Sequence, residues 1–264
     1  MTKAPISAPI TDKNQIKSMI EGFSPWYHRI KLPGNIVTPG LNNSDEMLSH
    51  LDMLGLPRNA KGMRVLDIGC RDGYFMFEME RRGAEVIGID YALPTTTGFS
   101  IISKILGSKT TFMVENVYDL SPEKHGRFDL ILFLGVLYHL RHPMLALDKI
   151  RSVSRPGALL FTETHLIDNY FQLKDGSFLP MGKISMSLID TPLMQYYPQD
   201  SLAGDATNKF APNMAALRAM THDAEFEVLA DYVVGSRGYV KARAIEDYSI
   251  SRFRRMDGST ELNR

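Results

Sequence analysis

The run Val65-Leu66-Asp67-Ile68-Gly69-Cys70-Arg71-Asp72-Gly73 constrains the fold of this chain more than any other feature. The apolar stretch Met63 to Ile68 predicts a buried parallel strand, and Tyr74 to Arg82 predicts a helix that ends at Gly83. A strand, a glycine turn and a helix in this order leave backbone N–H groups free to meet a ligand. The unit therefore predicts an α/β fold with a ligand site at the carboxyl end of its first strand.

A carboxylate at the end of the next strand indicates what kind of ligand this site holds. The strand Glu85 to Ile89 is followed by Asp90, about 20 residues after the glycines. An acid at this place accepts hydrogen bonds from both hydroxyls of a ribose. The sequence therefore predicts a nucleoside site, although two surface acids beside an ordinary turn remain an alternative.

The glycine loop does not match the G-x-G-x-x-G pattern that is typical of dinucleotide-binding proteins. It offers only Gly69 and Gly73, and Arg71 stands where a middle glycine would let a pyrophosphate approach. Asp67, just before the first glycine, would repel a phosphate but attract an ammonium group. This arrangement resembles the class I S-adenosylmethionine-dependent methyltransferases, whose ligand carries an amino group and no phosphate.

The resemblance implies that the cofactor is S-adenosyl-L-methionine. In the family, a polar side chain and a backbone N–H after the third strand lie against the adenine ring, and Asn116 and Val117 match these positions. The implied cofactor-binding residues are Asp67, Gly69, Arg71, Gly73, Asp90, Asn116, Val117 and Gly135.

The rest of the chain predicts a doubly wound, Rossmann-like sheet of seven strands that ends in an antiparallel hairpin. In the helix predicted from Met144 to Ser152, we expect Leu145 and Ile150 to point inward, with Val153 beyond it. The further strands expected are Thr111 to Val114, Phe128 to Leu134, Ala158 to Glu163, Glu227 to Val234 and Tyr239 to Ile245, with a helix from Asn213 to Ala224 before the last two.

The expected organisation has one main domain and three accessory parts. Residues 1–60 form a helical or lid segment, and 61–245 form the methyltransferase domain. An insertion at 164–212 leaves the carboxyl end of a strand, so we interpret it as a substrate cap; 246–264 are a polar tail. Trp26, in the N-terminal part, is either a lid over the site or a staple to the sheet, with the staple favoured.

Composition narrows the possible partners. Thirty basic and thirty acidic residues cancel, which favours a small-molecule acceptor over nucleic acid, and no apolar run reaches the length of a membrane helix. We expect a soluble, cytoplasmic protein without a metal site, and the sequence leaves the oligomeric state open. The single cysteine, Cys70, is expected to pack under the loop and not to act as a nucleophile.

Further motifs resemble a branch that contains the tRNA wobble-uridine carboxymethyltransferases. They are Gly135-Val136-Leu137-Tyr138-His139, Arg141-His142-Pro143, Tyr197-Pro198 and Asn208-x-Phe210-x-Pro212. The resemblance implies that Tyr138 helps to bind the carboxylate of carboxy-S-adenosylmethionine. Those enzymes have a long N-terminal extension and a segment rich in Trp and Lys before the sheet. Here the N-terminal part is short, and the stretch from Leu32 to Ser49 contains neither Trp nor Lys.

We therefore expect methyl transfer to an oxygen or nitrogen of a small-molecule acceptor, such as a sugar or a natural-product intermediate. The alternative is a tRNA wobble-uridine methyl- or carboxymethyltransferase, with Arg252, Arg254 and Arg255 of the tail in an RNA groove. An oxygen nucleophile would need a base. The candidate catalytic residues are His165, His139 and Tyr138, with Glu163 and Asp168 as further candidate bases at strand ends.

Overall fold

The computed structural model describes residues 8–245, and a seven-stranded sheet forms the centre of the molecule. The sheet order is β12-β13-β7-β6-β3-β4-β5. Strands β3 to β7 are parallel, β13 runs antiparallel to β7, and β12 runs antiparallel to β13. The strands are β3 (Arg64–Ile68), β4 (Glu85–Asp90), β5 (Thr111–Val114), β6 (Phe128–Leu134), β7 (Ser154–His165), β12 (Phe226–Val234) and β13 (Arg237–Ala244). The predicted Rossmann-like fold with a terminal antiparallel hairpin is confirmed.

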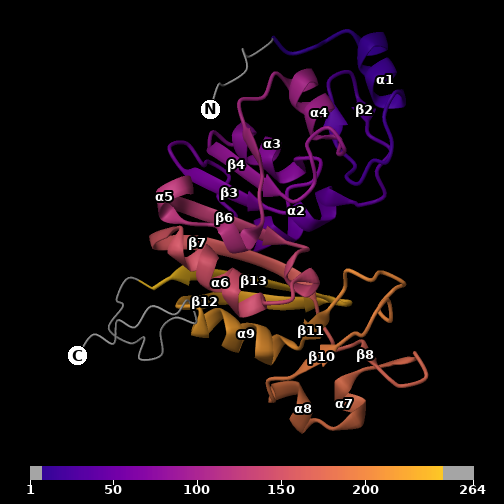
Figure 1. The fold of residues 1–264 in the computed structure, drawn as a ribbon, viewed down its shortest axis with the longest axis vertical. Helices are drawn as coiled ribbons and strands as arrows, with labels where there is room; N and C mark the ends of the chain where they lie inside the picture. The colour runs from indigo at the N-terminus through magenta and orange to yellow at the C-terminus, as the bar shows by residue number, and fades with distance from the viewer. Residues whose placement is uncertain (1–7, 246–264) are drawn as a thin grey trace.

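Helices cover both faces of this sheet (Figure 1). One face packs against α1 (Lys13–Glu21), α2 (Ser44–Met53), α3 (Tyr74–Arg81) and α4 (Phe99–Leu106). The other face packs against α6 (Pro143–Ser152) and α9 (Met214–Asp223), and the short helix α5 (Pro122–His125) precedes β6. Each face has its own apolar core, as expected for strands buried on both sides.

Two local expectations differ from the structure. Strand β7 begins at Ser154, four residues before the predicted start, because Ser154 pairs with Phe128 ahead of an irregularity in the ladder. Leu145 is 36% exposed, so the prediction that it points inward was wrong. The buried stripe of α6 runs through Ala146, Leu147 and Ile150, which leaves position 145 on the solvent side.

The N-terminal part contains a small hairpin and a buried tryptophan. Strands β1 (Lys31–Leu32) and β2 (Ile36–Val37) form this hairpin, which the sequence did not indicate. Trp26 is buried, packs edge-to-face on Phe23 with ring centres 5.0 Å apart, and donates a hydrogen bond from Nε1 to the Ile20 carbonyl at 3.2 Å. Trp26 also belongs to the apolar core that packs on this face of the sheet, which agrees with the interpretation of Trp26 as a staple.

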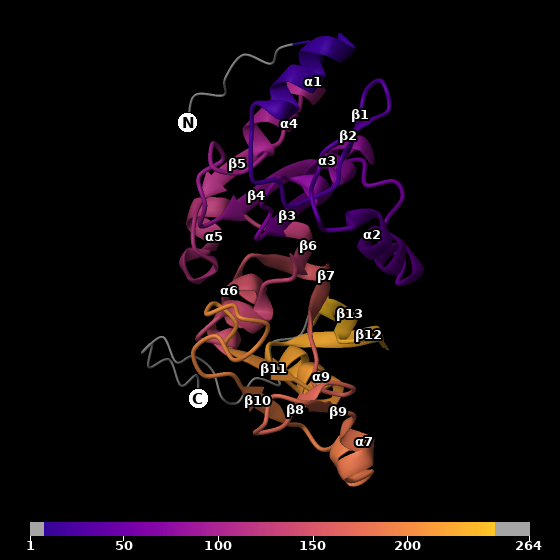
Figure 2. The same ribbon diagram turned by 90° about the vertical axis from the view of Figure 1, so that its right-hand side faces the viewer.

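Most of the 164–212 insertion lies toward the end of the molecule opposite α1, and its last part, with β11, lies beside α9 (Figure 2). It is not featureless. It contains β8 (Phe171–Gln172), β9 (Phe178–Leu179), α7 (Met181–Ile184), α8 (Ser187–Asp190), β10 (Met194–Tyr196) and β11 (Phe210–Pro212). Its own small core includes Ile167, Met181 and Tyr197. The insertion is therefore a packed substructure, and its role as a substrate cap remains a prediction.

Candidate active site

The loop after β3 has three residues in the left-handed backbone region. Gly69 has φ +75°, and a Cβ there would lie 2.4 Å from Cγ2 of Val136. Gly73, at the N-terminus of α3, has φ +87°, and a Cβ there would lie 2.7 Å from Phe99. Both positions therefore require glycine. Arg71 adopts φ +52° despite its side chain, a conformation that costs roughly 1–2 kcal/mol.

The two carboxylates at the ends of β3 and β4 are both buried but differ in their contacts. Asp90 accepts hydrogen bonds from the Arg71 N–H at 2.9 Å and from the Ala92 N–H at 2.8 Å. Asp67 is 2% exposed, and its Oδ2 has no hydrogen-bond partner within the described part of the chain. Burial raises the pKa of Asp67 to about 8, and the charge of Asp90 adds to this effect.

A buried carboxylate oxygen without a donor is costly, and an ammonium group would satisfy it. Asp67 therefore fits the amino group of S-adenosylmethionine, and Asp90 fits its ribose. Cys70 beside them is 3% exposed, and burial raises the pKa of its thiol. Its position agrees with the packing role expected from the sequence.

At the end of β5, Asn116 and Val117 are used structurally. The Asn116 side chain accepts a hydrogen bond from the Tyr118 N–H at 3.1 Å, which caps the 3-10 turn η1 (Val117–Asp119). The Val117 side chain is 5% exposed and belongs to the apolar core. Any contact of Val117 with an adenine ring therefore has to come from its backbone, as the resemblance implies.

A charged cluster follows at the ends of β6 and β7. The Glu163 side chain is fully buried, and both of its oxygens accept hydrogen bonds from Arg237, with Nη2 to Oε2 at 2.8 Å. The guanidinium carbon of Arg237 lies 4.9 Å from the centre of the Tyr138 ring. Gly135 lies against this pair, because a Cβ there would be 3.7 Å from Oε2 of Glu163. Burial raises the pKa of Tyr138.

The two candidate histidines have different environments. His139, in η2 (Leu137–His139), shares a hydrogen bond of 2.9 Å between its Nδ1 and Oγ1 of Thr207 in the insertion. Burial lowers the pKa of His139. His165, at the end of β7, lies 6.4 Å from Tyr138 between ring centres, and its Nε2 has no hydrogen-bond partner among residues 8–245. Burial, with the charge of Arg237, lowers the pKa of His165 to about 4.

The two further candidate bases have structural roles. Glu163 is held by Arg237 through both oxygens, so it is not available to take a proton from an acceptor. Asp168 accepts a hydrogen bond from the Met214 N–H at 2.9 Å and so fixes the start of α9. Glu163 lies near the end of β7 and Asp168 lies three residues beyond it, as expected, and their role as bases stays a prediction that these contacts do not favour.

A family model for a methyltransferase domain matches residues 43–208, which include this loop, both carboxylates and most of the insertion. The chain belongs to this methyltransferase family. It is a class I enzyme that depends on S-adenosylmethionine.

Curated relatives of this methyltransferase are named tRNA U34 carboxymethyltransferase. The protein of Cellvibrio japonicus is 32% identical over 69% of this chain and 56% of its own length. That of Campylobacter hominis is 30% identical over 59% of this chain and 54% of its own length. The methyltransferase thus spans about half the length of these curated relatives.

Solved structures share the fold. The N-terminal domain of EvdMO1, solved in the presence of SAH and D-fucose, superposes with a TM-score of 0.60 at 18% identity, covering 89% of this chain and 97% of that domain. The [4+2]-cyclase SpnF superposes with a TM-score of 0.57 at 15% identity, covering 89% and 93%. At such identities the likeness establishes the fold alone.

Sequence reasoning missed three residues that the methyltransferase places at this edge of the sheet: Tyr27, Asp72 and Arg237. Arg237 begins the last strand, and its register opposite His165 brings it to the carboxyl ends of the parallel strands. The antiparallel hairpin in the sequence could have indicated this position. Tyr27 lies with its ring centre 5.5 Å from the guanidinium carbon of Arg71, a contact that no local pattern signals.

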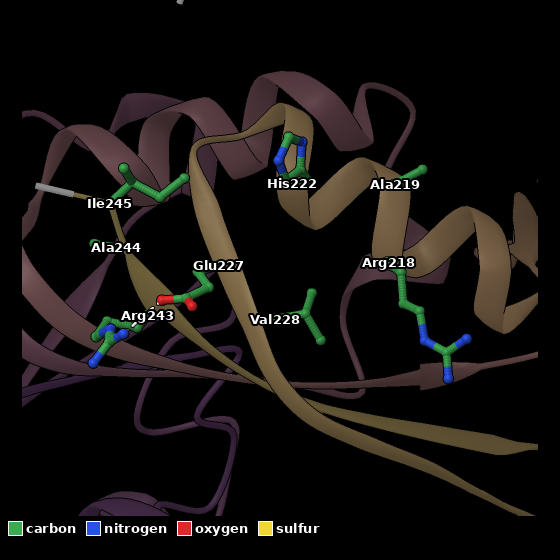
Figure 3. A pocket seen from close by; sticks show the side chains of 8 residues that line it. All are labelled: Arg218, Ala219, His222, Glu227, Val228, Arg243, Ala244 and Ile245. Atoms are coloured by element: carbon green, nitrogen blue, oxygen red, sulfur yellow. Dashed lines mark hydrogen bonds and ion pairs between the residues drawn. The ribbon is translucent and has the colours of Figure 1, made fainter. Parts of the chain in front are cut away.

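A groove of about 890 Å³ lies elsewhere, between the end of α9 and the strands β12 and β13 (Figure 3). Its charged groups are already paired, Arg218 with Asp231 and Arg243 with Glu227. The groove opens at the edge where the parallel strands begin, so it is not the site proposed for S-adenosylmethionine at their carboxyl ends.

Within residues 8–245 no three His, Cys, Asp or Glu side chains are grouped to hold a metal ion, and no helix is long and apolar enough to cross a membrane.

Proposed function

We propose that this methyltransferase transfers a methyl or carboxymethyl group to the wobble uridine of tRNA. Two things support this acceptor over the small molecule favoured by composition. The curated relatives carry the name tRNA U34 carboxymethyltransferase. The cluster of Tyr138 and Arg237 lies beside the Gly135 turn and offers a cation and a hydroxyl to a carboxylated donor.

The observation that most supports transfer of a carboxymethyl group is the position of the Arg237 guanidinium beside Tyr138. A carboxylated donor adds a negative charge next to its sulfonium and needs a cation and a hydroxyl to bind it. Glu163 fixes the guanidinium through Nε and Nη2, so the cation is oriented before any donor binds.

The residues of the chain have separable tasks in this proposal. The donor supplies a methyl or carboxymethyl group that its sulfonium has already activated. Asp67 and Asp90 hold the amino and ribose ends and so fix the direction of the transferred group, which must face the nucleophile in line. We assign His165 to orienting the acceptor, because its Nε2 has no hydrogen-bond partner among residues 8–245 and can form a hydrogen bond with the acceptor. With a pKa of about 4 it is a weak base.

Mass spectrometry of the ligand that copurifies with the protein tests the donor. S-adenosylmethionine supports methyl transfer, and the carboxylated form supports carboxymethyl transfer; S-adenosylhomocysteine is the product of both reactions and supports only the use of a donor of this class. Labelled donor incubated with total tRNA then tests the acceptor, and absence of label in tRNA with either donor would overturn the proposed acceptor. A tRNA acceptor also implies a cytoplasmic enzyme.

A small hydroxyl- or amine-bearing acceptor is the second candidate. The balanced count of thirty basic and thirty acidic residues favours it. Filter binding of total tRNA at low and moderate salt distinguishes the two. Binding to tRNA through phosphates falls steeply with salt, so weak, salt-independent retention would favour the small acceptor.

A further inference from the structure

A buried carboxylate in the glycine loop joins three separate segments. Asp72 is 1% exposed. Its Oδ2 accepts hydrogen bonds from the backbone N–H groups of Tyr27 and His28, both at 2.8 Å, and its Oδ1 accepts one from Gly98 at 2.9 Å. The three donors come from the N-terminal part and from the loop that leads into α4. The Asp72 side chain therefore connects both of these segments to the glycine loop after β3, which we call the donor loop.

The segment 26–42, which we call the entry segment, is folded tightly around this contact. Trp26 packs on Gly98, where a Cβ would lie 2.3 Å from Cζ3 of the indole. The segment turns back on itself, with hydrogen bonds from the Asn42 N–H to the Tyr27 carbonyl at 3.0 Å and from the Arg29 N–H to the Asn42 carbonyl at 3.1 Å. Its beginning and end are thus held at the same place.

The anchored segment presents Tyr27 to the active site. The Tyr27 side chain is 43% exposed and carries the ring that meets the Arg71 guanidinium. Tyr27 therefore lies exposed against the glycine loop after β3, at the same edge of the sheet as the cluster of Tyr138 and Arg237, where an acceptor would approach the transferred group.

We propose that Asp72 is a positioning residue, which ties the entry segment to the donor loop so that Tyr27 forms one wall of the acceptor site. A carboxylate suits this task because both of its oxygens accept hydrogen bonds. An asparagine could satisfy the Tyr27 and His28 amides or the Gly98 amide, but its NH₂ group would face the N–H groups on the other side. The inference rests on the donor site proposed above and on neither candidate acceptor.

Fluorescence gives a test that needs no acceptor, because Trp26 is the single tryptophan of the chain. In Asp72→Asn we expect acrylamide quenching of Trp26 to rise about twofold or more, since one set of anchoring hydrogen bonds is lost. Far-UV circular dichroism and the affinity for S-adenosylhomocysteine, within about threefold, should be retained. The matched control is Asp12→Asn, whose carboxylate accepts a hydrogen bond from the Gln15 N–H at 2.7 Å and caps α1.

Kinetics with total tRNA as the acceptor give the second measurement. We expect Asp72→Asn and Tyr27→Ala each to raise KM for tRNA about tenfold, with smaller changes in kcat, and the double variant to resemble Tyr27→Ala alone. Unchanged Trp26 quenching in a folded Asp72→Asn that binds S-adenosylhomocysteine would overturn the inference, as would additive effects in the double variant. No transfer to tRNA by the wild type would refute the proposed acceptor instead, and the fluorescence result would still decide the role of Asp72.

Discussion

Donor binding by this methyltransferase should depend on pH through one buried carboxylate. The pKa of Asp67 is raised to about 8 by burial, with Asp90 contributing, so the side chain is mostly protonated at neutral pH in the free protein. A donor ammonium group binds the ionised form. Binding therefore has to remove a proton from Asp67, and the free energy of this step grows as the pH falls below 8.

The size of the effect follows from the fraction of ionised Asp67. With a pKa of about 8, that fraction is about one half at pH 8, about one tenth at pH 7 and about one hundredth at pH 6. The affinity for S-adenosylhomocysteine should thus fall about fivefold from pH 8 to 7 and about tenfold more from pH 7 to 6. Isothermal titration in two buffers of different ionisation enthalpy should detect release of close to one proton at pH 7.

Asp67→Asn is the control, because it keeps the shape of the side chain and removes the titration. We expect it to bind more weakly at pH 8 and to show little dependence on pH between 6 and 8. A wild type whose affinity is flat over this range, with no proton released, would refute the assignment of the ammonium group to Asp67. The same raised pKa means that stability present below pH 4 is lost as the pH rises toward 8, so without donor Asp67→Asn should melt higher than wild type at pH 8.

Three further outcomes can be measured on the same protein. Asp90→Ala should weaken S-adenosylhomocysteine binding by about 1–3 kcal/mol in titration calorimetry, since the ribose loses its acceptor and the Arg71 and Ala92 amides lose theirs; unchanged affinity would remove Asp90 from the site. Glu163→Gln should lower the free energy of unfolding by about 2–3 kcal/mol in urea, less than for a fully buried pair because Arg237 is 30% exposed, and a neutral result would mean that the pair adds nothing. Excision of residues 166–206 should abolish turnover but keep donor affinity, because the donor loop lies on other strands; loss of affinity in a folded variant would contradict this division.

The sheet and the donor loop were predictable because short-range patterns determine them. Strand β5 spans Thr111–Val114 and β6 spans Phe128–Leu134, as the apolar runs predict. The turn after β3 was recognisable from its glycines, whose positive φ values no other residue adopts cheaply. The order of an acid, a glycine loop and a second acid then indicated the family, because this order places Asp67 and Asp90 near the carboxyl ends of two neighbouring parallel strands.

The rest of the site was not predictable, because it depends on contacts between distant segments. Nothing near Asp72 in the sequence indicates that it accepts hydrogen bonds from Tyr27 and His28, more than forty positions away. The bidentate contact of Glu163 with Arg237 requires the strand register between β7 and β13. The short strands of the insertion lack periodicity, because two or three residues are too few to establish a pattern.

The place of Arg237 in the chain sets the order in which the active site can be assembled. The donor loop, both of its acids and Tyr27 all precede residue 91, so a nascent chain contains every donor-binding carboxylate long before β13 is made. Glu163 then occupies a strand whose outer edge stays open until Arg237 arrives beside it. During synthesis, the donor half is therefore expected to fold first, and competence for transfer is acquired with one of the last strands.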